Sequence, residues 1–322
     1  MSNFDEFQRL KSYVSTHIIG QAHLINRLLI TLLANGHLLV EGAPGLAKTR
    51  AVKTLCEGIE GDFHRIQFIP DLLPADLTGT EVFRPQDGSF QFQHGPLFHN
   101  MILADEINRA PAKVQSALLE AMGERQITVA GHTYPLPDLF LVMATQNPIE
   151  QEGTYPLPEA QLDRFLMHIK IDYPNAEEES AILALFHREA RQDYQRTRAP
   201  VDKIPQDVIL AAREEILDIH MSKALQQYLV HFVLATRTPG AYHSTLAQWV
   251  QYGASPRATL ALDMCSRAHA WLAGRDFVTP EDIQALAFDV LRHRVLLRYE
   301  AQAEGITVDD LVNKLIEYVA VP

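Results

Sequence analysis

The chain has 322 residues, of which 28 are basic and 40 acidic, and its net charge is −12. Its length allows about two domains with buried cores. Its acidic balance argues against non-specific nucleic-acid binding, which depends on Lys and Arg side chains that neutralise phosphates, although a local basic surface would escape this argument. Cys56 and Cys265 lie far apart, so they predict a reducing compartment rather than a disulfide framework. No apolar run approaches the roughly 20 residues of a membrane span, and the N-terminal residues do not resemble a signal peptide. We therefore expect a cytoplasmic protein without a membrane span.

The first segment with a functional pattern is a strand, a loop and a helix near residue 40. The apolar residues 36–40 predict a buried strand, and residues 50–55 predict a helix. Between them lies a glycine-containing loop: Gly42, Ala43, Pro44, Gly45, Leu46, Ala47, Lys48 and Thr49, followed by Arg50. Glycines let successive N–H groups turn toward one anion, and the helix adds its positive end, so this pattern predicts a phosphate-binding P-loop. We expect Lys48 to contact the β- and γ-phosphates of a nucleotide and the Thr49 hydroxyl to ligate Mg²⁺.

One position departs from the usual P-loop pattern, G-x-x-x-x-G-K-[ST]. Ala47 stands where that pattern has glycine. Alanine costs little at a negative φ and is strained at a positive φ. Taken alone, the segment leaves open the alternative of a turn that happens to end in Lys-Thr.

The remaining apolar runs predict the fold class. Three of them predict further parallel strands: residues 65–69, 100–104 and 139–144. Helical segments alternate with these strands, so we predict an α/β domain with a parallel sheet covered by helices on both faces, whose ligands bind at the carboxyl ends of the strands. The rest of the chain is mainly helical. The predicted domains are an α/β nucleotide-binding core over 1–172, a linker with a helix over 173–200, and a smaller all-α domain over 201–322.

Two predicted hairpins interrupt the α/β pattern, near residues 80–93 and 125–136. The first contains an Asp-Gly turn at Asp87-Gly88, a strong hairpin signal. Hairpins inserted beside a nucleotide site are placed to act on something other than the nucleotide. The alternative, that they only cover the surface, stays open.

Polar side chains follow two of the predicted strands. Asp105 and Glu106 come directly after residues 100–104, where Asp105 would hold the water shell of Mg²⁺ and Glu106 would polarise an attacking water. Asn147 follows the next strand, where it could hydrogen-bond both the γ-phosphate and that water. The structural alternatives are an acidic helix start for the carboxylate pair and a turn before proline for Asn147.

Together these features resemble the AAA+ ATPases, and in particular the MoxR group, which is related to the magnesium-chelatase ATPase subunit. The resemblance covers nearly the whole chain in the right order and rests on the P-loop and five more segments: residues 65–79, 103–110, 144–148, 157–165 and 253–258. In that group an alanine before the P-loop lysine is usual, so Ala47 becomes a mark of the family. Ile69 departs from the family, which has a small polar residue there.

The resemblance also implies roles that the residues alone do not. The segment matched to adenine contact is His17, Ile18, Ile19, Gly20 and Gln21. Arg164 matches an arginine finger that points into the neighbouring subunit's site, with an ion pair to Asp163 or Glu159 as its alternative. Arg257 matches the sensor-2 arginine of the lid, with an ordinary surface arginine as its alternative. A finger that acts in trans implies a homo-oligomeric ring, a hexamer in this family. The pair His293-Arg294 also matches the family, and we interpret it as lid packing.

The function implied by the resemblance is Mg²⁺-dependent ATP hydrolysis that drives chaperone-like remodelling, maturation or metal insertion of a partner protein. The family's usual partners are proteins with von Willebrand factor A domains, and the sequence leaves the client open. One alternative is a nucleic-acid motor, because related ring ATPases grip DNA with similar hairpins; the net charge argues against it. The other is an ATP-gated scaffold, against which the set of Glu106, Asn147 and Arg164 argues.

Overall fold

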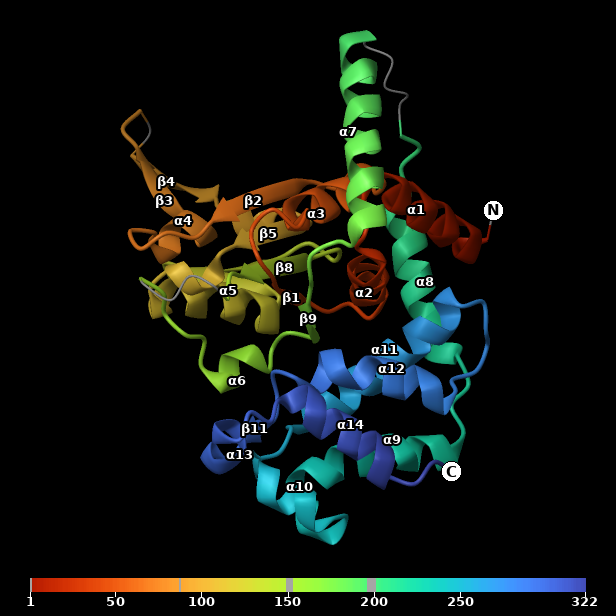
Figure 1. Cartoon of the computed structure of the whole chain (residues 1–322). Coiled ribbons are helices and arrows are strands. Elements are labelled where there is room, and N and C mark those ends of the chain that lie inside the picture. Colours follow the sequence, from red (N-terminus) through yellow and green to blue (C-terminus); the bar gives the residue numbers. More distant parts are fainter. Residues whose placement is uncertain (1, 87, 149–152, 196–200) are drawn as a thin grey trace. The chain divides into compact units, whose positions relative to one another are not determined.

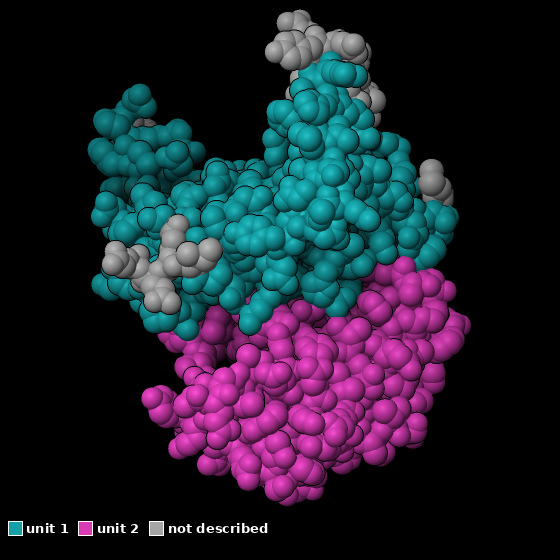
Figure 2. All heavy atoms as spheres, in the orientation of Figure 1, with its two compact units in different colours: residues 1–157, 169–210 teal, residues 158–168, 211–322 magenta. Residues whose placement is uncertain are grey.

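The computed structural model describes residues 2–86, 88–148, 153–195 and 201–322 (Figure 1). The chain forms two compact units, one from residues 1–157 and 169–210 and the other from residues 158–168 and 211–322 (Figure 2). Each unit has its own core.

The first unit is built on a five-stranded sheet in the order β2-β5-β8-β1-β9. Its strands are β1 (Leu38–Glu41), β2 (Phe63–Gln67), β5 (Met101–Asp105), β8 (Leu141–Gln146) and β9 (Met167–Lys170). The pairs β2–β5, β5–β8 and β8–β1 are parallel, and the side chains of the inner strands are almost all buried. Burial on both faces is what a parallel sheet requires, so the predicted α/β fold is confirmed.

Helices cover both faces of this sheet. The chain passes from β1 to β2 in one direction across the sheet and from β5 to β8 in the other. Because such crossovers are right-handed, the helices after β1 and β5, α3 (Lys48–Glu57) and α5 (Ala112–Glu124), lie on opposite faces (Figure 1). Two helices pack with α3, namely α1 (Asn3–His17) and α2 (Ala22–Leu33). The other helices of the unit are α4 (Pro74–Thr78), α7 (Ala176–Gln195) and the start of α8 (Gln206–Asp218).

Two antiparallel hairpins extend from the first unit. They consist of β3 (Gly79–Arg84) with β4 (Ser89–His94), and of β6 (Gln126–Val129) with β7 (His132–Pro135). Gly88 has a φ of +68°, which a side chain would strain, and so closes the first turn. The rings of Phe92 and Tyr134 stack with their centroids 4.2 Å apart, so the two hairpins contact each other.

The second unit is a helical domain, as predicted. Its main helices are α6 (Glu159–Leu162), α9 (Lys223–Arg237), α10 (Ser244–Trp249), α11 (Pro256–Leu272), α12 (Pro280–Leu291), α13 (Tyr299–Ala303) and α14 (Val308–Tyr318). It differs from the all-α expectation in one ribbon, β10 (Val250–Tyr252) with β11 (Leu296–Leu297). Such short strands have no recognisable period in the sequence. Over the residues that the structure describes, no helix is both long and apolar enough to span a bilayer.

Candidate nucleotide-binding and catalytic site

The predicted P-loop connects β1 to α3 and needs glycine where it starts. The Gly42 amide donates to the Gln146 carbonyl at 3.3 Å. A Cβ on Gly42 would lie 2.4 Å from Cγ1 of Ile171, so no larger residue fits without displacing that side chain. Gly45 has a φ of +87°, a conformation that favours glycine. The loop backbone therefore curls into the turn that a phosphate cradle requires.

The backbone of Ala47 has a positive φ, the conformation that is strained for alanine. It precedes α3 with φ +57° and ψ 18°, the left-handed region that a Cβ disfavours by about 1–2 kcal/mol. A glycine at this position would adopt the same backbone conformation without the steric strain. Strain of this kind collects at functional sites, where the surrounding structure holds it.

We expect Ala47→Gly to stabilise the nucleotide-free protein by up to about 1 kcal/mol, because relief of the left-handed strain outweighs the extra entropy of the unfolded chain. The control is Ala51→Gly inside α3, which should instead lower the free energy of unfolding by at least about 1 kcal/mol, because the helix loses propensity and Ala51 is fully buried. Urea unfolding measures both. The strain at Ala47 is refuted if the two glycines destabilise equally.

A cavity of about 390 Å³ lies over this loop. It is lined by Pro44 to Arg50 and by Arg65, Asp105, Glu106, Thr145 and Asn147. The ammonium of Lys48 donates to the Gly42 carbonyl at 2.5 Å. Burial lowers the pKa of Lys48, and the charges of Asp105 and Glu106 oppose this shift. The structure thus brings the predicted loop, the carboxylate pair and Asn147 into one cavity, as expected from parallel strands that end at one edge.

Asp105 ends β5 and is held by two neighbours that the sequence analysis did not identify. The Thr145 hydroxyl donates to its Oδ1 at 2.6 Å. Arg65 on β2 donates to Oδ2 at 2.5 Å. The same Thr145 oxygen accepts from the Glu106 amide at 2.9 Å. One buried hydroxyl therefore orients the carboxylate and the backbone that follows it.

Glu106 is also oriented by its surroundings. Its backbone is left-handed, with φ +57° and ψ 50°. Oε2 accepts from Gln67 at 2.8 Å and from Arg109 at 3.0 Å. A non-glycine residue in this conformation is uncommon, and here it turns the side chain into the phosphate cavity.

We expect Thr145→Val to lower ATP turnover by about 10–100-fold, the usual effect of losing a residue that orients a metal-binding carboxylate. Valine keeps the shape but removes both bonds of the hydroxyl, whereas Thr145→Ser keeps them. Turnover measured against Mg²⁺ concentration checks this. A positioning role for Thr145 is excluded if serine and valine behave alike.

The segment predicted to contact adenine lines a second cavity, of about 430 Å³. His17, Ile18 and Ile19 line it together with Gln21. Gly20 is not among the lining residues; it has a φ of +75° and lies against Pro174. The other wall comes from Tyr173, Pro174 and four residues of α7: Glu179, Ile182, Leu185 and Phe186. The P-loop residues Pro44 to Ala47 and Arg50 line this cavity too, so the two cavities share a wall.

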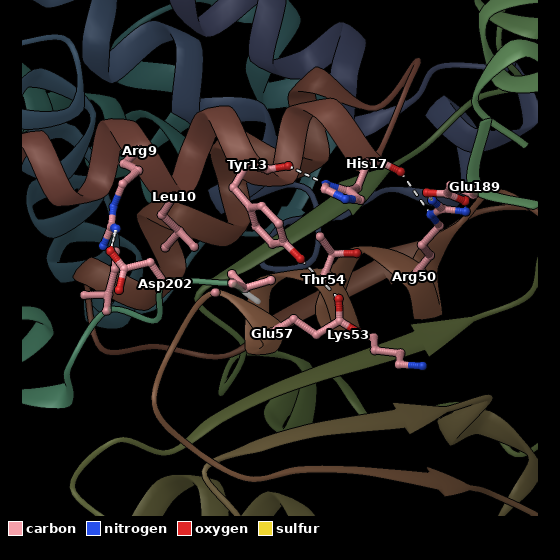
Figure 3. A pocket seen from close by; sticks show the side chains of 13 residues that line it. Arg9, Leu10, Tyr13, His17, Arg50, Lys53, Thr54, Glu57, Glu189 and Asp202 are labelled. Carbon is pink, nitrogen blue, oxygen red and sulfur yellow. Dashed lines mark hydrogen bonds and ion pairs between the residues drawn. The ribbon is translucent and has the colours of Figure 1, made fainter. Parts of the chain in front are cut away.

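Arg50 and His17 also border a third cavity, of about 680 Å³, between α1 and α3 (Figure 3). Arg50 donates through Nε to the His17 carbonyl at 2.9 Å and pairs with Glu189. On the other side, Arg9 pairs with Asp202. The charged lining thus ties α1, α3 and α7 together, and Arg50 belongs to this frame as much as to the P-loop.

The two remaining predicted residues, Arg164 and Arg257, belong to the second unit. Arg164 follows α6, and Arg257 lies in the first turn of α11. A guanidinium nitrogen of Arg257 lies 3.6 Å from an Asp163 carboxylate oxygen. The P-loop belongs to the first unit, so the roles of both arginines at the nucleotide stay predictions.

Comparison with known proteins gives the class. The family described as "ATPase family associated with various cellular activities (AAA)" matches residues 37–167, and the "AAA lid domain" matches residues 245–315. The chain is 46% identical over 306 residues to Chaperone MoxR1 of Mycobacterium tuberculosis, covering 95% of this chain and 79% of the relative. It is 32% identical over 336 residues to Protein MoxR of Paracoccus denitrificans, covering 98% and 96%. The crystal structure of a Cytophaga hutchinsonii protein assigned as an ATPase matches with a TM-score of 0.91 at 45% identity, covering 99% of this chain and 96% of that one.

The parallel sheet, the P-loop and the helical second unit therefore define an AAA+ ATPase. The chain belongs to the MoxR family of these ATPases. The alternative of a chance Lys-Thr turn is thereby excluded.

Proposed function

We propose that the two adjoining cavities hold ATP, with adenine against His17 to Ile19 and the phosphates over the loop from Gly42 to Thr49. Backbone N–H groups of the loop, the start of α3 and the Lys48 ammonium would bind the phosphates. The observation that supports this best is the shared wall of Pro44 to Ala47, because a nucleotide needs an apolar recess and an anion cradle side by side.

We propose Mg²⁺ as the cofactor of hydrolysis. The oxygen donors of Thr49 and Asp105 are of the type that Mg²⁺ prefers, and this ion keeps several waters instead of needing a cage of protein ligands. Asp105 accepts one bond from Thr145 on Oδ1 and two from Arg65 on Oδ2, which leaves a lone pair of Oδ1 for metal-bound water. The site therefore fits the ion, which would neutralise phosphate charge when bound.

In the proposed mechanism, Glu106 accepts a proton from the attacking water while Asn147 holds that water and the γ-phosphate. Arg257 would contact the nucleotide of its own subunit. Arg164 would reach the neighbouring subunit's site, so a lone subunit is incomplete. AAA+ ATPases commonly assemble as rings, and we propose a homohexamer. In this scheme residues 1–172 form the nucleotide-binding core, residues 173–200 connect it to the lid and supply the α7 wall of the adenine cavity, and residues 201–322 form the lid.

We further propose that hydrolysis drives chaperone-like remodelling, maturation or metal insertion of a client, together with a partner that carries a von Willebrand factor A domain. The relatives named as chaperone and MoxR proteins support this class of work. Cys56 and Cys265 are free thiols, which suits the cytoplasm that we propose as the compartment.

The two hairpin segments contain one arginine each, Arg84 and Arg125, and these are the candidate contacts of the nucleic-acid alternative. Arg125 closes α5 and donates to both the carbonyl and the side-chain oxygen of Asn35. This guanidinium is therefore engaged in the fold. Salt-dependent DNA binding that is lost in Arg84→Ala would still favour the alternative.

The proposal is tested by trapping the ATP-bound state with Glu106→Gln and capturing associated proteins in cells, with Lys48→Ala as the control that lacks a phosphate contact. We expect proteins with von Willebrand factor A domains to be enriched with the Glu106→Gln variant and not with the Lys48→Ala variant. Mass photometry with and without ATP measures how many subunits assemble. Equal recovery in both variants, or a monomer with ATP bound, would overturn the proposal.

A further inference from the structure

The segment that carries Arg164 is held by one buried arginine. The side chain of Arg294 is 2% exposed. Its five N–H groups donate to five acceptors: Asp163 Oδ1 at 2.8 Å and the carbonyls of Asp163 at 3.4 Å, Phe165 at 2.5 Å, Leu166 at 3.0 Å and Val290 at 2.6 Å. A guanidinium has five donors and is costly to bury unless all are paired. Four of these five acceptors flank Arg164 in the chain, so Arg294 fixes the backbone on both sides of it.

A second side chain binds the same backbone segment, residues 163–166. The ring of His293 is bonded to the Phe165 carbonyl at 3.1 Å through Nε2. Phe165 itself is fully buried. The pair His293-Arg294 is therefore more than the lid packing that the sequence suggested, because it binds the backbone next to Arg164.

The carboxylate of Asp163 joins this turn to the start of α11. While Oδ1 accepts from Arg294, Oδ2 accepts from the Ser255 hydroxyl at 2.8 Å. Ser255 is the N-cap of α11 and also accepts from the Arg257 amide at 3.1 Å. The Arg257 guanidinium lies 3.6 Å from the same Oδ2. One carboxylate thus connects the turn that carries Arg164 to the helix end that carries Arg257.

The start of α11 is fixed in turn to α9. Arg237 donates to the Ala254 carbonyl at 2.7 Å, and the Ala254 amide donates to Thr236 at 3.0 Å. A Cβ on Gly253 would lie 2.3 Å from the Thr236 carbonyl oxygen, so this close approach requires glycine. The start of α11 is therefore held on two sides, to α9 through Ala254 and to Asp163 through Ser255.

We propose that Asp163 and Arg294 are positioning residues that couple Arg257 to Arg164, so that the arginine which contacts ATP in one subunit sets the arginine offered to the next. This rests on the proposed roles of Arg164 and Arg257. Nucleotide binding at one site then changes the finger in the neighbouring site through a single ion-paired carboxylate. Asp163 touches neither nucleotide in this scheme and acts only through the two arginines.

The test is a double-mutant cycle with Asp163→Asn and Arg164→Ala, measured as kcat of assembled rings. We expect Asp163→Asn to lower kcat by up to about 100-fold, with the affinity for an ATP analogue little changed, because a finger displaced by about 1 Å can lose that much. In the Arg164→Ala background the same change should cost less than about twofold, since the residue through which it acts is gone. Equal losses in both backgrounds would overturn the coupling.

A matched control separates coupling from stability. Asp282 is 2% exposed and pairs with Arg275 in the same unit, at 2.5 Å. Asp282→Asn should lower the melting temperature, and its effect on kcat should be the same with and without Arg164→Ala. If Asp163→Asn fails to fold, Ser255→Asp serves instead: it keeps a good N-cap but places a second carboxylate against Asp163, and we expect the same non-additive loss.

The outcomes also distinguish this inference from the function on which it rests. If Arg164→Ala alone leaves kcat unchanged, the proposed finger role fails and the coupling fails with it. If Arg164→Ala strongly lowers kcat while Asp163→Asn and Ser255→Asp lower it by the same further factors with and without Arg164→Ala, only the coupling is refuted.

Discussion

Replacing Glu106 with glutamine should lower ATP hydrolysis by about 10²–10⁴-fold, the range that a general base contributes. Glutamine keeps the size of the side chain and can still bond Gln67 and Arg109, but it cannot take a proton from water. ATP binding should be unchanged, because the phosphate contacts lie on the loop from Gly42 to Thr49. Steady-state turnover and the Kd of a fluorescent ATP analogue measure the two effects separately.

The control for this prediction is Glu124→Gln. Glu124 is the last residue of α5, which begins beyond Glu106, and it does not line the phosphate cavity. Turnover should survive this change. Normal hydrolysis by Glu106→Gln would refute the assignment and favour an ATP-gated scaffold or a different base.

Arg164→Ala should lower turnover by about 10³–10⁵-fold, the range found for arginine fingers that stabilise charge on the transferred phosphoryl group. The P-loop of each Arg164→Ala subunit stays intact, so each subunit should still bind ATP. The loss appears in the neighbouring site, which no longer receives a guanidinium. Turnover of assembled rings measures the loss.

Mixed rings show whether the residue acts in trans. Lys48→Ala subunits lack a phosphate contact but keep Arg164, and Arg164→Ala subunits have the opposite defect. Each variant alone should be inactive, and a mixture should regain activity wherever an intact P-loop meets an intact arginine. Inactive mixtures, in rings that mass photometry shows to be mixed, would place Arg164 in its own subunit's site and remove the argument for an obligatory ring.

The local parts of the site could be predicted from the sequence. The P-loop and the pair Asp105-Glu106 are each contained in a few consecutive residues, and the parallel fold brings strand ends together whatever the loops do. The predicted strands were displaced slightly: the apolar run near 139 begins as a strand only at Leu141. Hydrophobicity marks burial better than it marks where hydrogen bonding begins.

The supporting contacts could not be predicted, because each depends on register or on distant packing. Thr145 contacts Asp105 across 40 positions of the chain, and Arg294 contacts Asp163 across 131. The conformation of Ala47 was equally out of reach, since alanine carries no local signal for a positive φ. The residues that orient the site are therefore read from the structure, while those that carry its chemistry are read from the sequence.

The stacked rings of Phe92 and Tyr134 have a practical consequence for dissecting the hairpins. A two-stranded ribbon is marginally stable by itself, and an aromatic pair of this kind adds about 0.5–1.5 kcal/mol. Deleting either hairpin would remove the packing partner of the other and expose Phe92 or Tyr134 to water. A loss of activity after such a single deletion would thus report on both inserts at once. Both hairpins have to be removed together, or changed only at their tips, before contact with a client can be assigned to either of them.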